Sequence, residues 1–378
     1  MRFGVAGSVF GGLNDLLVRN NLLGPILGQL GVTELLPETP LAANGTLQTY
    51  SNSVFGQATY HFTDTVSLTL GLRAQDEKRT IVQSGGAVDL PIGPDVPYTS
   101  FSGQSDTTRS LSPKVSLEFR PWDDGLVYTS FQQATKSSTY NVVNFLRFEV
   151  PDPVKPEKLT AYEVGAKKTL FDGTTSLSSA AFWYEIRNQQ VQFLSLLAGG
   201  AVTFENAPAA RIRGLDFDVT SELFPSVFSG LVLTIGGAYL DTEYTDFPNG
   251  QGFDNLGLYT RADYSGNRIP RSPEFSGTVG LSQTLEVPGG VVEIAGDYYY
   301  NSGFYYLAQN TDFDHEQAYG LLGAHVSYLY EPWQLRTTVF GKNLTDERYN
   351  YSKFTNDFGA LNAVAPPVTY GVRLSWEF

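Results

Sequence analysis

Apolar and polar residues alternate with a period of two in many segments of the chain. In 115–120, for example, Val115, Leu117 and Phe119 alternate with polar residues, and 214–220 repeats the pattern. Successive side chains of a β-strand point to opposite faces of its sheet. Each of these segments is therefore predicted to be a strand with one apolar and one polar face, and the chain is predicted to be all-β.

Fourteen segments are strand candidates, and the breaks between them alternate in length. The candidates are 2–9, 46–61, 65–82, 108–121, 124–138, 157–171, 174–194, 201–222, 229–245, 267–286, 290–306, 315–331, 333–346 and 366–378. Short breaks such as 122–123 and 172–173 alternate with long ones such as 83–107 and 139–156. Tight turns at one end of the strands and long loops at the other are typical of an outer-membrane β-barrel.

Strands of a soluble β-sheet also alternate apolar and polar residues, so two further features decide between a soluble sheet and an outer-membrane barrel. Many of the candidates exceed a dozen residues, whereas strands of soluble proteins average about five or six. Their polar faces carry charge, as at Glu293 and Asp297, which suits a water-filled lumen. We predict an antiparallel transmembrane β-barrel with short periplasmic turns and long extracellular loops. The apolar stretch 17–36 is interrupted by too many polar residues for a spanning helix.

The composition narrows the possible functions. The chain has 25 Phe, 22 Tyr and 4 Trp, no cysteine and a net charge of −14. The lack of cysteine excludes a disulfide framework, a zinc–thiolate site and a thiol catalyst, and the acidic charge argues against a nucleic-acid partner. Because Tyr and Trp favour the headgroup region of a membrane, the six rings within 298–306 are predicted to lie at its border.

Several segments resemble the barrel domain of TonB-dependent outer-membrane receptors. The most specific is FGKNLTDERY at 340–349, followed by a last strand that ends in Phe378. The upstream matches are SVFGQATY at 53–60, LGLR at 70–73, SPKVS at 112–116, YEVG at 162–165, the stretch from Asn206 to RIRGLD at 211–216, and IPRSPEF at 269–275. The resemblance covers residues 45–378.

The resemblance implies a barrel of about 22 strands whose lumen is filled by a plug. The chain has about fourteen strand candidates and no segment for a plug, a TonB box or a signal peptide. We therefore expect residues 1–378 to be a single, partial barrel domain from the C-terminal part of such a receptor. An even number of strands would place both ends on the periplasmic side. Strand edges without a partner are not tolerated in lipid unless the arc closes on itself.

The resemblance also implies a function, a location and partners. The function is energy-coupled uptake of a ferric siderophore or a similar large nutrient across the bacterial outer membrane. The partners are outer-membrane lipid, the nutrient, the outer-membrane assembly machinery, and TonB only through the missing plug. A passive porin-like channel is the alternative, because a closed barrel of fewer strands would be one.

Three segments receive specific expectations. Residues 10–45 are predicted to form a long apolar extracellular loop that packs on other loops. In the C-terminal strand 366–378, Tyr370, Trp376 and Phe378 resemble the signal that the assembly machinery reads, although an ordinary aromatic belt would look the same. Asn343 and Asp346 are expected to form a turn by bonding nearby backbone groups.

Catalytic and metal-binding signatures are weak. His325 and Ser327 share a strand face, but residues two apart on a strand are about 7 Å apart, too far for direct proton transfer. We therefore favour a polar lumen pair over a hydrolase centred on Ser327. The three histidines are too scattered for haem capture, no phosphate-binding loop is present, and no cofactor is predicted.

Two acidic groups could supply oxygen ligands for Ca²⁺. The first comprises Asp312, Asp314 and Glu316, which alternate in a predicted loop; the second comprises Asp241, Glu243 and Asp246. A solvated acidic loop is the favoured interpretation of both, so no metal site is predicted.

Overall fold

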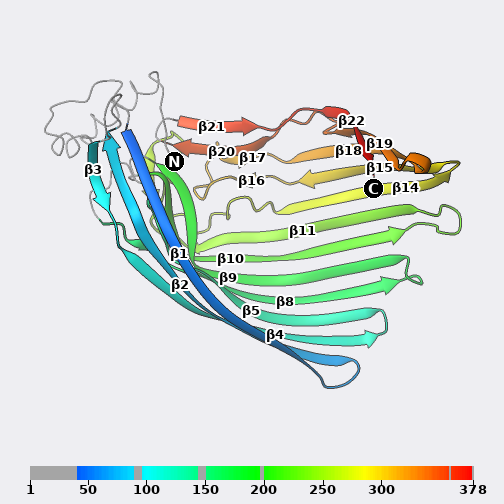
Figure 1. Cartoon of the computed structure of the whole chain (residues 1–378), viewed down its shortest axis with the longest axis horizontal. Coiled ribbons are helices and arrows are strands. Elements are labelled where there is room, and N and C mark those ends of the chain that lie inside the picture. Colours follow the sequence, from blue (N-terminus) through cyan, green and yellow to red (C-terminus); the bar gives the residue numbers. More distant parts are fainter. Residues whose placement is uncertain (1–40, 89–95, 144–149, 196–199, 357–358, 377–378) are drawn as a thin grey trace.

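Long antiparallel strands form one curved sheet (Figure 1). The computed structural model describes residues 41–88, 96–143, 150–195, 200–356 and 359–376. The strands pair in the order β1 (Leu41–His61), β2 (Val66–Val88), β4 (Ser105–Trp122), β5 (Gly125–Lys136), β8 (Glu157–Leu170), β9 (Thr175–Ser195), β10 (Gly200–Glu222), β11 (Leu231–Asp246), β14 (Phe275–Val287), β15 (Gly290–Asn301), β18 (Tyr319–Tyr330), β19 (Leu335–Lys342) and β22 (Thr369–Trp376). A short strand, β3 (Val96–Phe101), adds to the far end of β2.

These strands coincide with the predicted ones from 46–61 onward, whereas candidate 2–9 lies outside the described residues. The main error is 267–286, because β14 begins only at Phe275. Pro270 and Pro273 lack the N–H groups that a ladder needs, and Arg271 has a φ of 58°. Likewise β15, β18 and β19 are shorter than predicted, because the residues beyond their ends fold into loops.

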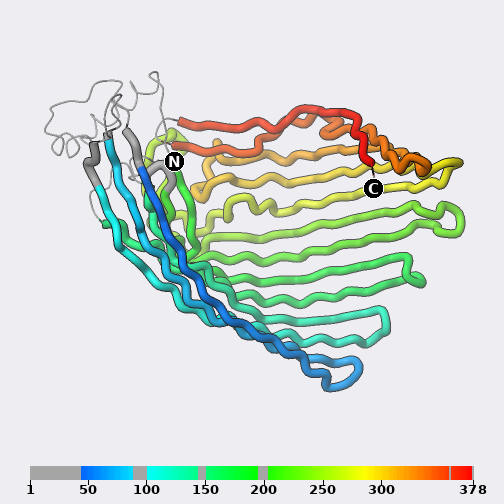
Figure 2. Tube along the Cα trace, in the orientation of Figure 1, coloured from blue at the N-terminus to red at the C-terminus, as the bar shows by residue number. Residues whose placement is uncertain are grey.

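The sheet does not close on itself among the described residues. Its two edges are β1 and β22, and the pairing runs from one to the other without a bond between them. The tube view shows β1, β2 and β4 bending strongly across the other strands (Figure 2). The predicted partial barrel is therefore an open, curved arc among the described residues. Both edges are exposed, with Phe55 at 77% and Tyr370 at 78% exposure.

The two ends of the strands differ as predicted. At one end, the turn end, neighbouring strands are joined by short connections such as 62–65, 123–124 and 288–289, and by the 3-10 helix η1 (Glu331–Trp333). At the other end, the loop end, longer connections fold into two-stranded hairpins. They are β6 (Thr139–Tyr140) with β7 (Pro153–Val154), β12 (Gly250–Phe253) with β13 (Tyr259–Ala262), β16 (Phe304–Tyr305) with β17 (His315–Glu316), and β20 (Asn350–Asn356) with β21 (Gly359–Val364).

The two faces of the sheet also differ. The register places Glu293 opposite Ser327 and Asp297 opposite Gly323, so polar positions of neighbouring strands share one face, which we call the inner face. The other face, the outer face, carries exposed apolar side chains. They include Leu70, Leu72, Val115, Leu117, Val164, Leu215, Val279, Leu281, Ile294, Val326, Val339 and Val372. An apolar face this extensive requires an apolar environment or a partner.

The loops pack onto the inner face at the loop end. Ile186 and Ala210 project inward from the middle of β9 and β10, and Tyr244 projects inward near the end of β11. They form a buried cluster with the loop residues Phe247 and Tyr264. The Phe247 ring contacts the Tyr244 ring at 5.1 Å and the Tyr264 ring at 5.4 Å between centroids. Among the described residues, the main cluster of buried hydrophobic side chains thus lies where the loops pack on the sheet.

Two sequence expectations need correction at their boundaries. Of the predicted loop 10–45, residues 41–45 belong to β1 and pair with β2, and the remainder lies outside the described residues. Of the six rings within 298–306, Tyr298 and Tyr300 are exposed on the outer face, but Tyr306 is 5% exposed inside the loops. In the part of the chain that the structure describes, no helix has the length and apolar character needed to cross a membrane.

Candidate functional site

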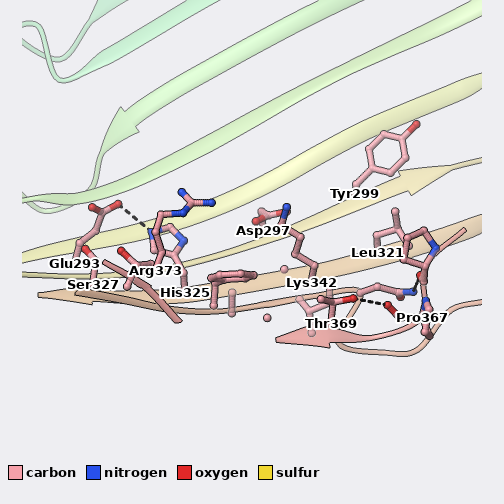
Figure 3. Close-up of a pocket in the computed structure, with 18 of the residues that line it drawn as sticks. Glu293, Asp297, Tyr299, Leu321, His325, Ser327, Lys342, Pro367, Thr369 and Arg373 are labelled. Carbon is pink, nitrogen blue, oxygen red and sulfur yellow. Dashed lines mark hydrogen bonds and ion pairs between the residues drawn. The ribbon is translucent and has the colours of Figure 1, made fainter. Parts of the chain in front are cut away.

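A hollow of about 930 Å³ lies on the inner face over the last four strands (Figure 3). Its polar wall comprises Glu293 and Asp297 from β15, His325 and Ser327 from β18, Arg336 and Lys342 from β19, and Arg373 from β22. These positions meet because they are cross-strand neighbours in the register. Three permanent cations face two carboxylates, so this wall is locally basic in an acidic chain. The predicted lumen-facing positions of Glu293 and Asp297 are confirmed.

The His325 and Ser327 pair does not form a catalytic unit in this geometry. His325 Nε2 lies 3.4 Å from Glu293 Oε1, while Ser327 Oγ is buried and has no hydrogen-bond partner among the described residues. A nucleophilic serine needs a base within hydrogen-bond reach. The pair therefore lines the wall without meeting the requirement for a hydrolase.

A second hollow, of about 500 Å³, lies among the loops at the loop end; we call it the loop cleft. One wall is the end of β9, from Gln189 to Leu194, and the opposite wall comprises Arg271, Tyr306 and Lys353. The Arg271 guanidinium lies 5.1 Å and the Lys353 ammonium 6.0 Å from the centre of the Tyr306 ring. Two cations beside one aromatic face are suited to an anionic, partly aromatic ligand.

Lys353 and Arg271, the two cations of the loop cleft, differ in burial and in hydrogen-bond partners. Lys353 is mostly buried, donates to the His315 carbonyl at 2.6 Å and pairs with Glu316 at 3.3 Å. Arg271 is exposed and makes only a long bond to the Tyr351 carbonyl at 3.4 Å, with no carboxylate partner among the described residues. Arg271 is therefore the charge most available to a ligand.

Tyr306 is fixed between these groups. Its hydroxyl group donates to the Asn350 carbonyl and lies 3.4 Å from Glu316 Oε2. Burial and the neighbouring Glu316 carboxylate raise the pKa of Tyr306 well above its ordinary value, so it stays neutral and keeps its hydrogen-bond donor. On the facing wall, Gln189 Oε1 is buried and has no hydrogen-bond partner among the described residues.

Amide side chains attach the loops to the strand ends. The Asn206 side chain accepts from the Lys155 N–H at 2.8 Å and donates to the Lys155 and Asn188 carbonyls at 3.0 and 2.8 Å. Asn141 exchanges two bonds with the backbone of Phe204 in the same way. These amides satisfy loop backbone groups that would otherwise be buried without partners.

The acidic candidates Asp312, Asp314 and Glu316 are not brought together around one point. Asp312 is exposed, whereas Asp314 accepts from Thr311 at 2.6 Å and Glu316 faces Lys353 and Asn350. Burial raises the pKa of Asp314. Among the described residues no group of three or more His, Asp or Glu side chains has an arrangement that could hold a metal ion.

The second acidic group lies in a strand and not in a loop. Asp241 and Glu243 belong to β11 and pair with Arg213 at 2.6 Å and Arg211 at 2.7 Å on the outer face. The alternating acids resemble loop composition, because a strand end that projects beyond a membrane is as polar as a loop.

The predicted turn at Asn343 and Asp346 is confirmed. Both have positive φ values, Asn343 bonds both backbone groups of Glu347 at 2.8 and 2.9 Å, and Asp346 accepts from the Val368 N–H at 3.0 Å. The turn thereby ties the end of β19 to the start of the last strand. In that strand Tyr370 and Trp376 are exposed on the outer face, and Phe378 lies outside the described residues.

Sequence reasoning missed the loop cleft. The segment 269–275 was noted for its resemblance, but nothing assigned Arg271 a role, and Lys353 carried no signal at all. Their proximity depends on loops 80 residues apart in sequence, which no periodic pattern reveals.

The family model described as TonB dependent receptor-like, beta-barrel matches residues 4–372. The chain belongs to this family. The pesticin receptors of Yersinia enterocolitica and Yersinia pestis are each 24% identical to it, over 91% of this chain and 46% of their own length. The chain thus spans less than half the length of these relatives.

Solved structures of several uptake receptors share the fold. The ferric yersiniabactin uptake receptor FyuA from Yersinia pestis superposes with a TM-score of 0.71 at 21% identity, over 88% of this chain and 46% of that one. The siderophore receptor PiuA from Acinetobacter baumannii gives 0.63 at 18%, over 87% and 43%. The ferric-catecholate import receptor Fiu from Escherichia coli K12, in its closed form, gives 0.62 at 17%, over 90% and 46%.

Proposed function

We propose that this chain is the barrel portion of an outer-membrane receptor that takes up an iron–siderophore complex. The observation that carries the proposal is the loop cleft, where Arg271 and Lys353 flank the Tyr306 ring above a polar inner face. Membership of the TonB-dependent family and the siderophore receptors among its structural relatives support it. The outer face would contact lipid, and energy from TonB would arrive through a plug.

The charge of the cleft indicates an anionic ligand. Exposed Arg271 offers a planar guanidinium that can bond two acceptor oxygens at once. On the opposite wall, the Gln189 amide oxygen has no hydrogen-bond partner among the described residues and can accept from a donor group of the ligand. Ligand captured here would next meet the basic wall formed by Arg336, Lys342 and Arg373. An iron chelate with carboxylate or phenolate oxygens has matching chemistry.

Binding of a panel of ferric chelates by Arg271→Gln tests the proposal. Titration of the purified receptor with ferric yersiniabactin and a ferric catecholate should show at least tenfold weaker binding of the preferred chelate by this variant. The matched control is Arg348→Gln, because Arg348 is also exposed in a loop, pairs with Asp346 and is not among the residues that line the cleft. Equal affinities of the two variants, or no binding of any ferric chelate by the wild type, would contradict the proposal.

A passive channel would behave differently. The loops form a packed cluster on the inner face, which favours a gated passage over a permanently open pore. Receptor incorporated into liposomes should show no large steady conductance without energy input. Sustained porin-like currents would support the channel instead.

We further propose that Tyr370, Trp376 and Phe378 form the assembly signal of the last strand. Tyr370 and Trp376 share the exposed outer face of the edge strand β22, where another protein can reach them. Phe378→Ser should lower the amount of folded protein in the outer membrane several-fold, measured by heat-modifiable gel mobility. Phe171→Ser, at an exposed turn-end ring outside this strand, is the control. An unchanged folded yield of Phe378→Ser would refute the role.

A further inference from the structure

The connection between β10 and β11 carries exposed apolar side chains at the turn end (Figure 1). Phe224, Val227 and Phe228 are each more than half exposed, and the segment 223–230 contains no charged residue. We call residues 224–228 the apolar tip. Several other turn-end connections are shorter and contain aspartate, as in 62–65, 123–124 and 171–174. A contiguous apolar patch of this kind indicates contact with a membrane or a partner.

The apolar tip is a hydrogen-bonded turn. The Val227 and Phe228 N–H groups both donate to the Phe224 carbonyl at 2.8 Å, and the Leu231 N–H donates to the Phe228 carbonyl at 3.1 Å. Phe224 has a φ of 50°, a left-handed conformation that bulky residues rarely adopt. The chain thus keeps a phenylalanine ring where glycine or asparagine would cause less strain. The exposed rings therefore belong to a turn of defined shape.

The turn is bonded to the outer face of the sheet. Gln283 lies on that face of β14, in one row with the exposed residues Leu281 and Leu285. Its amide nitrogen donates to the Ser229 carbonyl at 2.9 Å and to the Thr284 carbonyl at 2.8 Å. Polar groups that satisfy one another in this way need no water, which is the condition for placing them in lipid. The bond to Ser229 therefore joins the apolar tip to the apolar row of the outer face.

We propose that the apolar tip inserts into the periplasmic leaflet of the outer membrane and contacts phospholipid acyl chains below the headgroups. Phenylalanine suits this depth better than tyrosine would, because its ring has no polar atom that must stay hydrated. Lipid is the occupant that fits, since the tip is uncharged and continues the apolar outer face, which would itself contact lipid. The inserted tip would fix the depth of the turn end in the bilayer. This contact is independent of the nutrient and of the loop cleft.

A single fluorescent label can report on the tip, because the chain has no cysteine. Ser226→Cys places the label within the tip and leaves its three exposed apolar side chains intact. The labelled protein is incorporated into vesicles of phosphatidylethanolamine and phosphatidylglycerol. Nitroxide groups on the lipid acyl chains should quench this label several-fold more strongly than a label at Asp124→Cys, the matched control in the exposed acidic turn 123–124. Iodide on both sides of the membrane should quench the control label more strongly.

A charged variant tests whether the apolar side chains cause the insertion. Val227→Asp plus Phe228→Asp, combined with Ser226→Cys, should lower quenching by the nitroxide lipid to the level of the control label, because a carboxylate is costly to place in hydrocarbon. The matched control is Val227→Leu plus Phe228→Leu in the same labelled background. It changes the same two positions, keeps them apolar and should leave the quenching unchanged.

Three results would overturn the proposal. The first is equal quenching of the labels at positions 226 and 124 by the nitroxide lipid, and this comparison decides the matter if the aspartate variant does not fold. The second is undiminished lipid quenching in the aspartate variant, with its folding shown by gel mobility. The third is protection of the tip label from both the nitroxide lipid and iodide, which would show that a protein or a second copy of this chain covers the tip.

Discussion

The two faces of this sheet are made from the same strands, but different interactions stabilise their side chains. Side chains of the outer face, such as Leu281 and Val339, remain exposed and touch little else in the chain. The inner face is joined by specific bonds, such as that from the Tyr128 hydroxyl group to Glu163 at 2.7 Å. The residue types tolerated at an outer position therefore depend on the surrounding medium, whereas those tolerated at an inner position depend on the neighbouring side chains. Substitutions on the two faces should consequently destabilise the protein for different reasons.

The largest difference in stability between an outer-face and an inner-face substitution is expected near the middle of β14. Leu281→Arg places a charge on the outer face, which should cost about 2–4 kcal/mol in a bilayer. Ser282→Arg, the next residue, points inward and should cost less than about 1 kcal/mol. Urea unfolding in lipid vesicles, followed by gel mobility, measures both variants. Equal destabilisation would mean that the two faces share one environment.

A smaller effect is expected where an inner amide holds a loop. Asn206→Ala removes three bonds to the backbone and should destabilise the attachment of segment 150–156 by about 1–3 kcal/mol. Faster hydrogen exchange in that segment is the measurement. Asn52→Ala on the outer face is the control and should leave exchange unchanged; a similar increase in both variants would show that the contacts of Asn206 are not what holds the segment.

The buried carboxyl of Asp314 should make the loops sensitive to pH. Because burial raises the pKa of Asp314 above 3.8, its protonated form is favoured in the folded loop. The resulting stability is complete below about pH 3.8 and is lost as the pH rises through the folded-state pKa. Protease sensitivity of segment 302–318 should therefore increase with pH more steeply in the wild type than in Asp314→Asn, in which the neighbouring groups Glu316, Lys353 and His315 are unchanged. Parallel pH profiles would contradict this.

The smallest effect is expected for an exposed ion pair of the outer face. Arg109 and Asp76 are 2.9 Å apart, but the Arg109 side chain is 83% exposed. Arg109→Gln should change the free energy of unfolding by less than about 1 kcal/mol, because water and salt screen such pairs. The unfolding midpoint at low and high salt is the measurement, and a large salt-dependent loss would show that this surface is less hydrated than its exposure indicates.

The sequence predicted the strands well because period-two alternation reports directly on the two environments. It located the strand at 108–121 within three residues of β4, and the lumen positions of Glu293 and Asp297 followed from the same alternation. It placed the start of β14 eight residues too early, because the segment before Phe275 is equally rich in strand-compatible residues apart from its prolines.

The loop cleft could not be predicted by that reasoning, for a physical reason. Lys353 and Arg271 meet over Tyr306 only because separate loops fold onto one cluster, and tertiary packing of this kind leaves no periodic trace. Closure could not be predicted either, since alternation is the same in an arc and in a closed barrel.

The unequal lengths of the strands have a consequence for how a ligand would be gripped. β9 and β10 have 21 and 23 residues, whereas β15 and β18 have 12 each, a difference of about 30 Å at roughly 3.3 Å per residue. One wall of the loop cleft is therefore continuous sheet, at Gln189 to Leu194. The other wall consists of loop residues, which are Arg271, Tyr306 and Lys353. The loop wall can move without breaking the hydrogen bonds of the main sheet, whereas the β9 wall cannot. We therefore expect ligand binding and release to involve movement of the loop wall against a fixed β9 wall.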